Sequence, residues 1–177
     1  MSHDVPNDGL PAVTGDLKRS ESGGREHKRE HILCVRLPLQ GVSLLVPYAC
    51  VAEIVNLSLR NHVGAFLGEV DWRGVRIPVL SLERACGWEV EVPRGRVRLV
   101  VLYGLRDKES LPYYAIVLDG VPRTESVQAE RLKEGQASDC GLLGSEVMMG
   151  GQTYHIPDLE AIEVWLERVR FGRVGRG

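Results

Sequence analysis

The chain has 177 residues and a formal net charge of −2, and 44% of its residues are hydrophobic but only 6% aromatic. This composition is that of a folded globular protein and excludes a low-complexity or fully disordered chain. Burial must therefore depend on Val, Leu and Ile, whose short runs between Gly and Pro favour short strands over long helices.

Residues 1–30 are polar, contain scattered Gly and Pro, and follow no helical or strand period, so we expect a disordered tail. Basic and acidic residues balance in this tail, which leaves no net positive field for phosphate groups. It also lacks the apolar segment of a secretory signal, and no run in the chain approaches the roughly 20 apolar residues of a membrane helix. We therefore expect a cytoplasmic protein without membrane insertion.

The first ordered segment reads as a β-hairpin. Residues 32–37 place Leu33, Val35 and Leu37 on one face of a strand, and Gln40-Gly41 offers a turn into a second strand over 42–46. Pro47 ends that strand, and a further strand is expected at 51–55.

A second hairpin is predicted in the stretch 67–82. Apolar and polar residues alternate over 70–72 and again over 75–79, on either side of Arg73-Gly74, which has the character of a tight turn. Pro78 has no N–H for a ladder, so the second strand should be open on one edge there. Ser81 is suited to cap a short helix over 82–86.

The spacing of these residues resembles the signature of CheW-like domains, the adaptor modules of bacterial chemosensory arrays. The resemblance rests on Gly68, Arg73-Gly74, Ile77-Pro78-Val79 and Leu82, and it extends over about 31–167 through weaker elements at 51–55 and 117–121. It implies a mainly β, CheW-like fold in which two five-stranded SH3-like β-barrel lobes share a core and a C-terminal helix follows. The Pro- and Gly-containing stretch 88–95 is the expected seam between the lobes.

In the second half, residues 96–102 are apolar on one face, and the other face starts with arginines and becomes apolar at Val100. Such a strand is either covered on both faces or lines a groove, and the resemblance favours the groove. After a strand at 113–118, Asp119-Gly120 is either a hairpin turn or a bend. Residues 126–138 are expected to form a loop with a helical turn.

The C-terminal part predicts a hairpin and a helix. Strands at 147–149 and 153–156 are expected to pair across Gly150-Gly151. A helix should begin at Asp158, and a short basic tail is assigned to 168–177. The helix has an expected buried stripe of Leu159, Ile162, Leu166 and Val169, with Glu160, Glu163 and Glu167 outside.

No constellation of catalytic or metal-ligating residues is visible, so we expect neither an enzyme nor a bound metal or cofactor. The five histidines form no pair at ligand spacing, and neither Asp119 nor Glu53 has a partner visible in the sequence. The four cysteines contain no Cys-x-x-Cys motif, and we expect them to be buried reduced thiols: Cys34, Cys50, Cys86 and Cys140.

The resemblance implies a non-catalytic scaffold that couples methyl-accepting chemoreceptor tips to a CheA-type histidine kinase, in a swimming or a type IV pilus chemosensory system. The residues it assigns to a receptor-binding groove are Val51, Gly68, Arg73 and Val121; the kinase-binding residues are not identified. A guanidinium such as that of Arg73 offers five donors in a fixed fork, which suits a carboxylate or helix-end carbonyls of a partner.

The alternative is a small β-barrel nucleic-acid-binding module that uses Arg94, Arg96 and Arg98. The net charge of −2 argues against it, and we expect no nucleic-acid partner.

Overall fold

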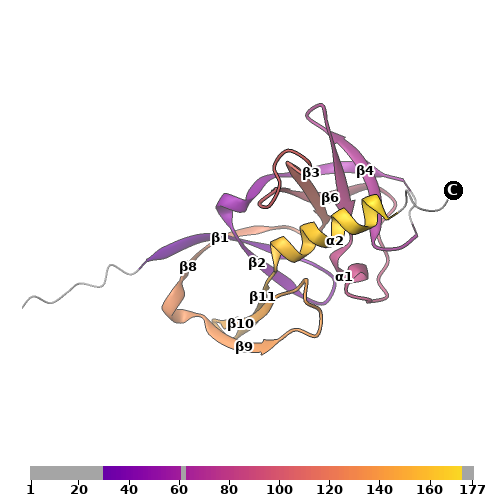
Figure 1. Ribbon diagram of the computed structural model, residues 1–177. Helices are drawn as coiled ribbons and strands as arrows, with labels where there is room; N and C mark the ends of the chain where they lie inside the picture. The colour runs from indigo at the N-terminus through magenta and orange to yellow at the C-terminus, as the bar shows by residue number, and fades with distance from the viewer. Residues whose placement is uncertain (1–29, 61–62, 173–177) are drawn as a thin grey trace, which may run out of the picture.

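The fold is described for residues 30–60 and 63–172 of a computed structural model. Nearly all of the expected N-terminal tail, and the end of the C-terminal tail, lie outside the described residues. The described part forms two mostly antiparallel sheets and a C-terminal helix (Figure 1), so the expected two-lobed, mainly β fold is confirmed.

The first lobe is a six-stranded sheet with the order β8-β1-β2-β11-β10-β9, one strand more than expected. Both hairpins predicted for it are present, across Gln40-Gly41 and across Gly150-Gly151. Both glycines of the second turn have positive φ, as a tight two-residue turn requires. The strands are β1 (His31–Pro38), β2 (Ser43–Pro47), β8 (Arg123–Gln128), β9 (Lys133–Ala137), β10 (Ser145–Met149) and β11 (Gln152–Ile156).

The second lobe is a five-stranded sheet with the order β3-β6-β7-β5-β4. Within it, β5 pairs with β7 only from Val79 onward, so the segment up to Pro78 pairs with β4 alone, as the missing N–H of Pro78 predicts. The strands are β3 (Val51–Leu59), β4 (Phe66–Trp72), β5 (Val75–Leu80), β6 (Gly95–Tyr103) and β7 (Tyr113–Val117). Short helices η1 (Tyr48–Cys50), α1 (Leu82–Ala85) and η2 (Ala129–Arg131) lie between strands.

The chain crosses between the lobes at η1, after β2, and again at Asp119-Gly120, after β7; the stretch 88–95, expected as the seam, instead leads from α1 to β6 within the second lobe. The Asp119 N–H donates to the carbonyl of Pro38 at 2.8 Å, and Gly120 has φ 128°. The dipeptide is therefore a bend that leads β7 of one sheet into β8 of the other, and not a hairpin turn. Within 126–138 the expected helical turn is present as η2, but the expected loop is wrong, since β8 extends into this stretch and β9 follows η2.

Strand β6 is covered on both faces, so the groove expected along it is wrong. Val100 and Leu102 are fully buried in a core between the two lobes, whereas Leu99 and Val101 are fully buried in a second core within the five-stranded sheet. This is the other reading that a strand apolar on both faces allows.

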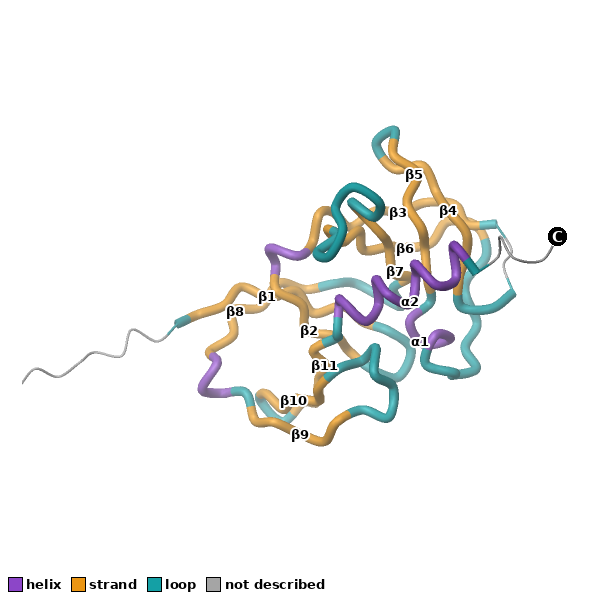
Figure 2. The backbone as a smooth tube through the Cα atoms, viewed as in Figure 1, coloured by secondary structure: helices purple, strands orange, loops and turns teal. Residues whose placement is uncertain are grey.

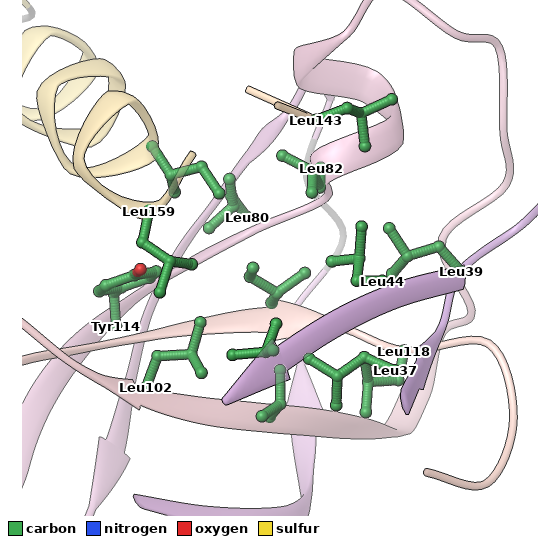
Figure 3. Close-up of a cluster of buried hydrophobic side chains, with 14 of the residues drawn as sticks. Leu37, Leu39, Leu44, Leu80, Leu82, Leu102, Tyr114, Leu118, Leu143 and Leu159 are labelled. Atoms are coloured by element: carbon green, nitrogen blue, oxygen red, sulfur yellow. The ribbon is translucent and has the colours of Figure 1, made fainter. Parts of the chain in front are cut away.

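Helix α2 (Leu159–Phe171) closes the shared core. Asp158 caps it by accepting the N–H of Ala161 at 2.9 Å, and Figure 3 shows Leu159 directed toward Leu80 and Tyr114 of the second lobe. The helix continues beyond 167, so residues 168–171 are helical and not part of a tail. Glu163, expected on the exposed side of this helix, is fully buried, because its carboxylate accepts backbone N–H groups of the loop between β6 and β7.

The expectation of four reduced cysteines is also wrong. Cys86 and Cys140 form a disulfide between Cα atoms 5.4 Å apart, and only Cys34 and Cys50 are free. Sequence spacing could not indicate this bond because its partners are 54 residues apart.

Candidate partner-binding site at the Arg73 turn

The β4–β5 hairpin projects from the second lobe, with the Arg73-Gly74 turn at its tip (Figure 2). Arg73 has φ 49° and Gly74 has φ 78°, the pair of positive values that a two-residue turn between twisted strands requires. Among the described non-glycine residues, Arg73 alone has a positive φ. A residue other than glycine in this conformation is uncommon, and such residues concentrate at functional positions.

Glu53 of β3 fixes the Arg73 side chain. One carboxylate oxygen of Glu53 accepts the Nε–H of Arg73 at 3.0 Å and the indole N–H of Trp72 at 2.7 Å. These two hydrogen bonds, of which the one from Arg73 has the larger effect, hold the pKa of Glu53 below its usual value, so the carboxylate remains ionised. In return, the bond to Glu53 raises the pKa of Arg73.

The remaining donors of Arg73 are available to a partner. Its side chain is 69% exposed, and within residues 30–60 and 63–172 only its Nε–H is hydrogen-bonded. The guanidinium carbon lies 5.4 Å from the centre of the Trp72 ring, a cation–π contact that orients its plane. The site therefore presents a positioned fork of N–H donors at the tip of a hairpin.

Aromatic rings anchor the base of this hairpin. Trp72 meets Tyr113 edge to face at 4.9 Å, and Tyr113 in turn lies 5.6 Å from Tyr103. Trp72 is only 9% exposed, so it supports the turn from inside and is not a contact surface itself.

A small hollow of about 150 Å³, with a lining of both polar and apolar residues, lies between the starts of β3 and β8, and Glu53 lines it. Val51 lines it as well, and Val121, which is 65% exposed, immediately precedes its wall residue Pro122. Pockets for small-molecule ligands are typically about 300–1,000 Å³, so this hollow is suited to one or two side chains of a protein partner. Its lining comprises Val35, Tyr48, Val51, Ala52, Glu53, Ile54, Pro122, Arg123 and Thr124.

Gly68 lies apart from the other predicted site residues. It has φ 87° and sits where the β4–β5 register shifts between Phe66 and Glu69. At about 3.3 Å per residue it is roughly 16 Å along the strand from Arg73. Val51 and Arg73 are thus linked through Glu53, which binds Arg73 and lines the hollow with Val51. Val121 is only the chain neighbour of the lining residue Pro122, and Gly68 lies outside this arrangement.

Glu53 was missed as a site residue, because in the sequence its only visible role was that of an unpartnered carboxylate. The alternating pattern of β3 indicates which face Glu53 lies on, but it cannot indicate that Glu53 contacts Arg73, which lies in another hairpin. Tyr48 and Ile54, both exposed at the rim of the hollow, were missed for the same reason.

The arginines of the nucleic-acid alternative are partly engaged within the chain. Arg98 donates to the Gly120 carbonyl at 2.6 Å, and Arg96 to that of Asn56 at 3.4 Å. Nearby lies a hollow of about 960 Å³ that is lined by Arg60, Arg84 and Arg94 but also by Glu91 and Asp119, so its charge is mixed.

In the described part of the chain, no three or more His, Cys, Asp or Glu residues are grouped so as to hold a metal ion. Nor is any helix there long and apolar enough to span a membrane.

Comparison with known proteins agrees with this architecture. The family model of the CheW-like domain matches residues 31–165 of the sequence. Among solved structures, the scaffolding protein TtCheW from Thermoanaerobacter tengcongensis superposes with a TM-score of 0.60 at 15% identity, covering 73% of this chain and 90% of its own. No curated protein matches the sequence significantly. Since the matched residues make up well over half of the chain, this protein belongs to the CheW-like domain family.

Proposed function

We propose that this protein is a non-catalytic cytoplasmic adaptor of a chemosensory pathway, which couples the tips of methyl-accepting chemoreceptors to a CheA-type histidine kinase. Family membership and the similarity to a scaffolding protein support an adaptor role. The observation that carries the receptor contact is Arg73, held by Glu53 with its terminal N–H groups free at the tip of a projecting hairpin.

The geometry of the site suits a helical partner. A helix or helical hairpin can place an aliphatic side chain in the hollow beside Val51 while its carboxylates or end carbonyls accept hydrogen bonds from Arg73. Tyr48 and Val121, which are 52% and 65% exposed, supply apolar surface at the rim. The kinase would bind elsewhere on the lobes, so that both partners are held at once and each contact influences the other.

The test is capture of two partners from the same cell: the cytoplasmic half of a chemoreceptor and the regulatory domain of a CheA-type kinase. Arg73→Glu should lower receptor affinity at least about tenfold, because it reverses a charge at a site built for a cation and leaves Glu53 facing a second carboxylate. Kinase binding should be unchanged.

Arg76→Glu is the matched control. Arg76 lies on the same hairpin, its side chain is 64% exposed, and its ion pairs are with Glu69 and Asp71 instead of Glu53. Equal losses for the two variants would mean that general charge, and not the Arg73 site, governs binding. Failure of the wild type to bind either partner would refute the adaptor proposal, and capture that disappears after nuclease treatment would favour the nucleic-acid alternative.

The same proposal extends to the output of the pathway, which is either swimming or type IV pilus motility. Deleting the gene and scoring both kinds of movement would distinguish them, and normal chemosensory behaviour in both assays would contradict the proposal.

A further inference from the structure

One covalent bond crosses the seam between the two lobes. Cys86 ends α1, which follows β5 of the five-stranded sheet, whereas Cys140 lies in the turn that leads into β10 of the six-stranded sheet. Their bond closes a loop between residues 54 positions apart. It therefore restrains the position of one lobe relative to the other, in addition to the shared core.

The bond also secures the start of α2. The carbonyl of Leu142, two residues after Cys140, accepts the N–H of the helix cap Asp158 at 3.1 Å. Leu143 is buried in the shared core, where Figure 3 shows it beside Leu82 of α1. Residues 138–144 thus connect α1, through the disulfide, to the first turn of the helix that closes the core.

Non-covalent contacts remain at the seam without the disulfide. The buried carboxylate of Glu83 accepts the backbone N–H of Gln40 at 3.0 Å, and the Gln40 side chain donates to the Glu91 carbonyl at 2.7 Å. Because these bonds also join the first lobe to the α1 region, a reduced protein would stay folded but hold its seam less tightly. Two folded states that differ at one surface are the requirement for a switch.

The two bonded cysteines differ from the two free ones in their surroundings. Cys86 and Cys140 are both partly exposed, one at the end of a one-turn helix and the other in a turn, where a reductant can approach. Cys34 is only 6% exposed on β1, whereas the free Cys50 is partly exposed, as the bonded pair is. Burial raises the pKa of both the Cys34 and the Cys50 thiol, which makes them poor nucleophiles.

We propose that the Cys86–Cys140 disulfide is a reversible redox latch between the lobes, opened by a dithiol reductant. A thiolate of the dithiol attacks one sulfur of the bond and releases the other cysteine as a thiolate, which takes up a proton. The second thiol of the reductant then attacks the mixed disulfide and releases the remaining cysteine. One disulfide gains two electrons and two protons, and one dithiol is oxidised to a disulfide.

In the cytoplasm, dithiol reductants keep most thiols reduced, and disulfides that form there are commonly redox-sensing. A redox-sensing role in the cell rests on the cytoplasmic location given under the proposed function, whereas the opening of the disulfide by a dithiol does not. The test below uses the isolated full chain, so that failure of the latch is distinguishable from failure of the adaptor role.

The experiment treats the full chain with dithiothreitol under native conditions and follows thiol alkylation and amide hydrogen exchange by mass spectrometry. Reduction should expose two thiols, at Cys86 and Cys140, and should raise amide exchange at least about tenfold in segments 82–88 and 138–144 and at the start of α2. Strand β6 should keep its protection. The melting temperature should fall by about 10 °C, and re-oxidation should restore both values.

The Cys86→Ser/Cys140→Ser variant should match the reduced wild type with or without dithiothreitol, and Cys34→Ser/Cys50→Ser should respond like the wild type. Reduction that occurs only when the whole chain unfolds in urea would show a permanent staple and overturn the latch. Unchanged exchange at the seam after reduction would overturn it as well. If the double serine variant fails to fold, the reduced and oxidised wild type still decide the question.

Discussion

At the scale of the residue, Glu53 determines how Arg73 is presented, and its ionisation gives this contact a pH dependence. Its pKa is lowered by the hydrogen bonds from Arg73 and Trp72. A carboxylate whose folded-state pKa is below its unfolded value stabilises the fold above the unfolded pKa, about 4.3 for glutamate. That stabilisation is lost as the pH falls through the folded-state pKa.

We therefore predict that Glu53→Gln is less stable than the wild type at pH 7 and that the difference shrinks toward zero as the pH falls below about 4. Urea midpoints measured from pH 7 to pH 3 test this. Asp107 also has a lowered pKa, through its bonds with Ser110, but it is present in both proteins and cancels in the difference. Glu134→Gln, on the exposed strand β9, controls for the change in net charge. A difference that stays constant with pH would contradict the prediction.

The turn itself could be predicted from the sequence, whereas the partner of Arg73 could not. Arg73-Gly74 lies between two alternating segments, and both features depend on residues within a few positions of each other. Glu53 lies 20 positions away on a different strand, and its contact with Arg73 follows from the sheet topology. Val51 and Val121 were assigned through the family resemblance, and the hollow between them has no local signal.

At the scale of the element, Glu163 connects α2 to the loop between β6 and β7. Both of its carboxylate oxygens accept backbone N–H groups, that of Leu105 at 2.7 Å and that of Arg106 at 2.9 Å. Glu163 is fully buried, and the ion pair of Arg106 with Glu167 at 3.1 Å reinforces the same contact. The loop therefore depends on this helix for two hydrogen bonds that its own backbone does not supply.

Glu163→Leu should reduce the free energy of unfolding by about 3 kcal/mol, because it leaves two backbone N–H groups without acceptors. Glu163→Gln, which keeps one acceptor oxygen, should lose less. Glu160→Gln, on the exposed side of the same helix, should change stability by no more than about 0.5 kcal/mol. Urea unfolding gives the free energies, and amide exchange at Leu105 and Arg106 locates the effect. Equal stability of Glu163→Leu and the wild type would show that the loop finds other acceptors.

This helix shows where pattern reading fails for an element. A 3.6-residue period identifies an apolar stripe correctly at Leu159, Ile162 and Leu166, but it assigns every charged residue to solvent. Glu163 is buried because a loop distant in sequence supplies donors for it. Strand β9 was missed for the opposite reason, because its residues are all exposed and only pairing with β10 makes it a strand.

At the scale of the whole molecule, the two lobes are joined by one core. The shared cluster takes Leu37 and Leu44 from the first sheet, Leu80 and Leu102 from the second, and Leu159 from α2 (Figure 3). The sequence predicted two lobes with a common core through the family resemblance. It could not show that one face of β6 packs in this shared core and the other face in the core of the second lobe. Alternation of residues along a strand does not reveal what covers each face.

Because neither lobe can bury its inner face alone, we predict that the two lobes unfold together while the disulfide is intact. Leu102→Ala removes a fully buried side chain from the shared core and should cost about 2–5 kcal/mol, lowering amide protection equally in β2 and in β7.

Val127→Ala, in the smaller cluster within the first lobe, should cost less but should also affect both lobes equally if unfolding is cooperative. Urea unfolding followed by tryptophan fluorescence, which reports on Trp72, Trp88 and Trp165, should coincide with far-UV circular dichroism from both sheets. Two separate transitions, or a loss of protection confined to the lobe that carries the substitution, would mean that the lobes are independent domains in contact. The geometry between Arg73 and any second binding surface would then be free to vary, and rigid coupling of two partners through this molecule would lose its physical basis.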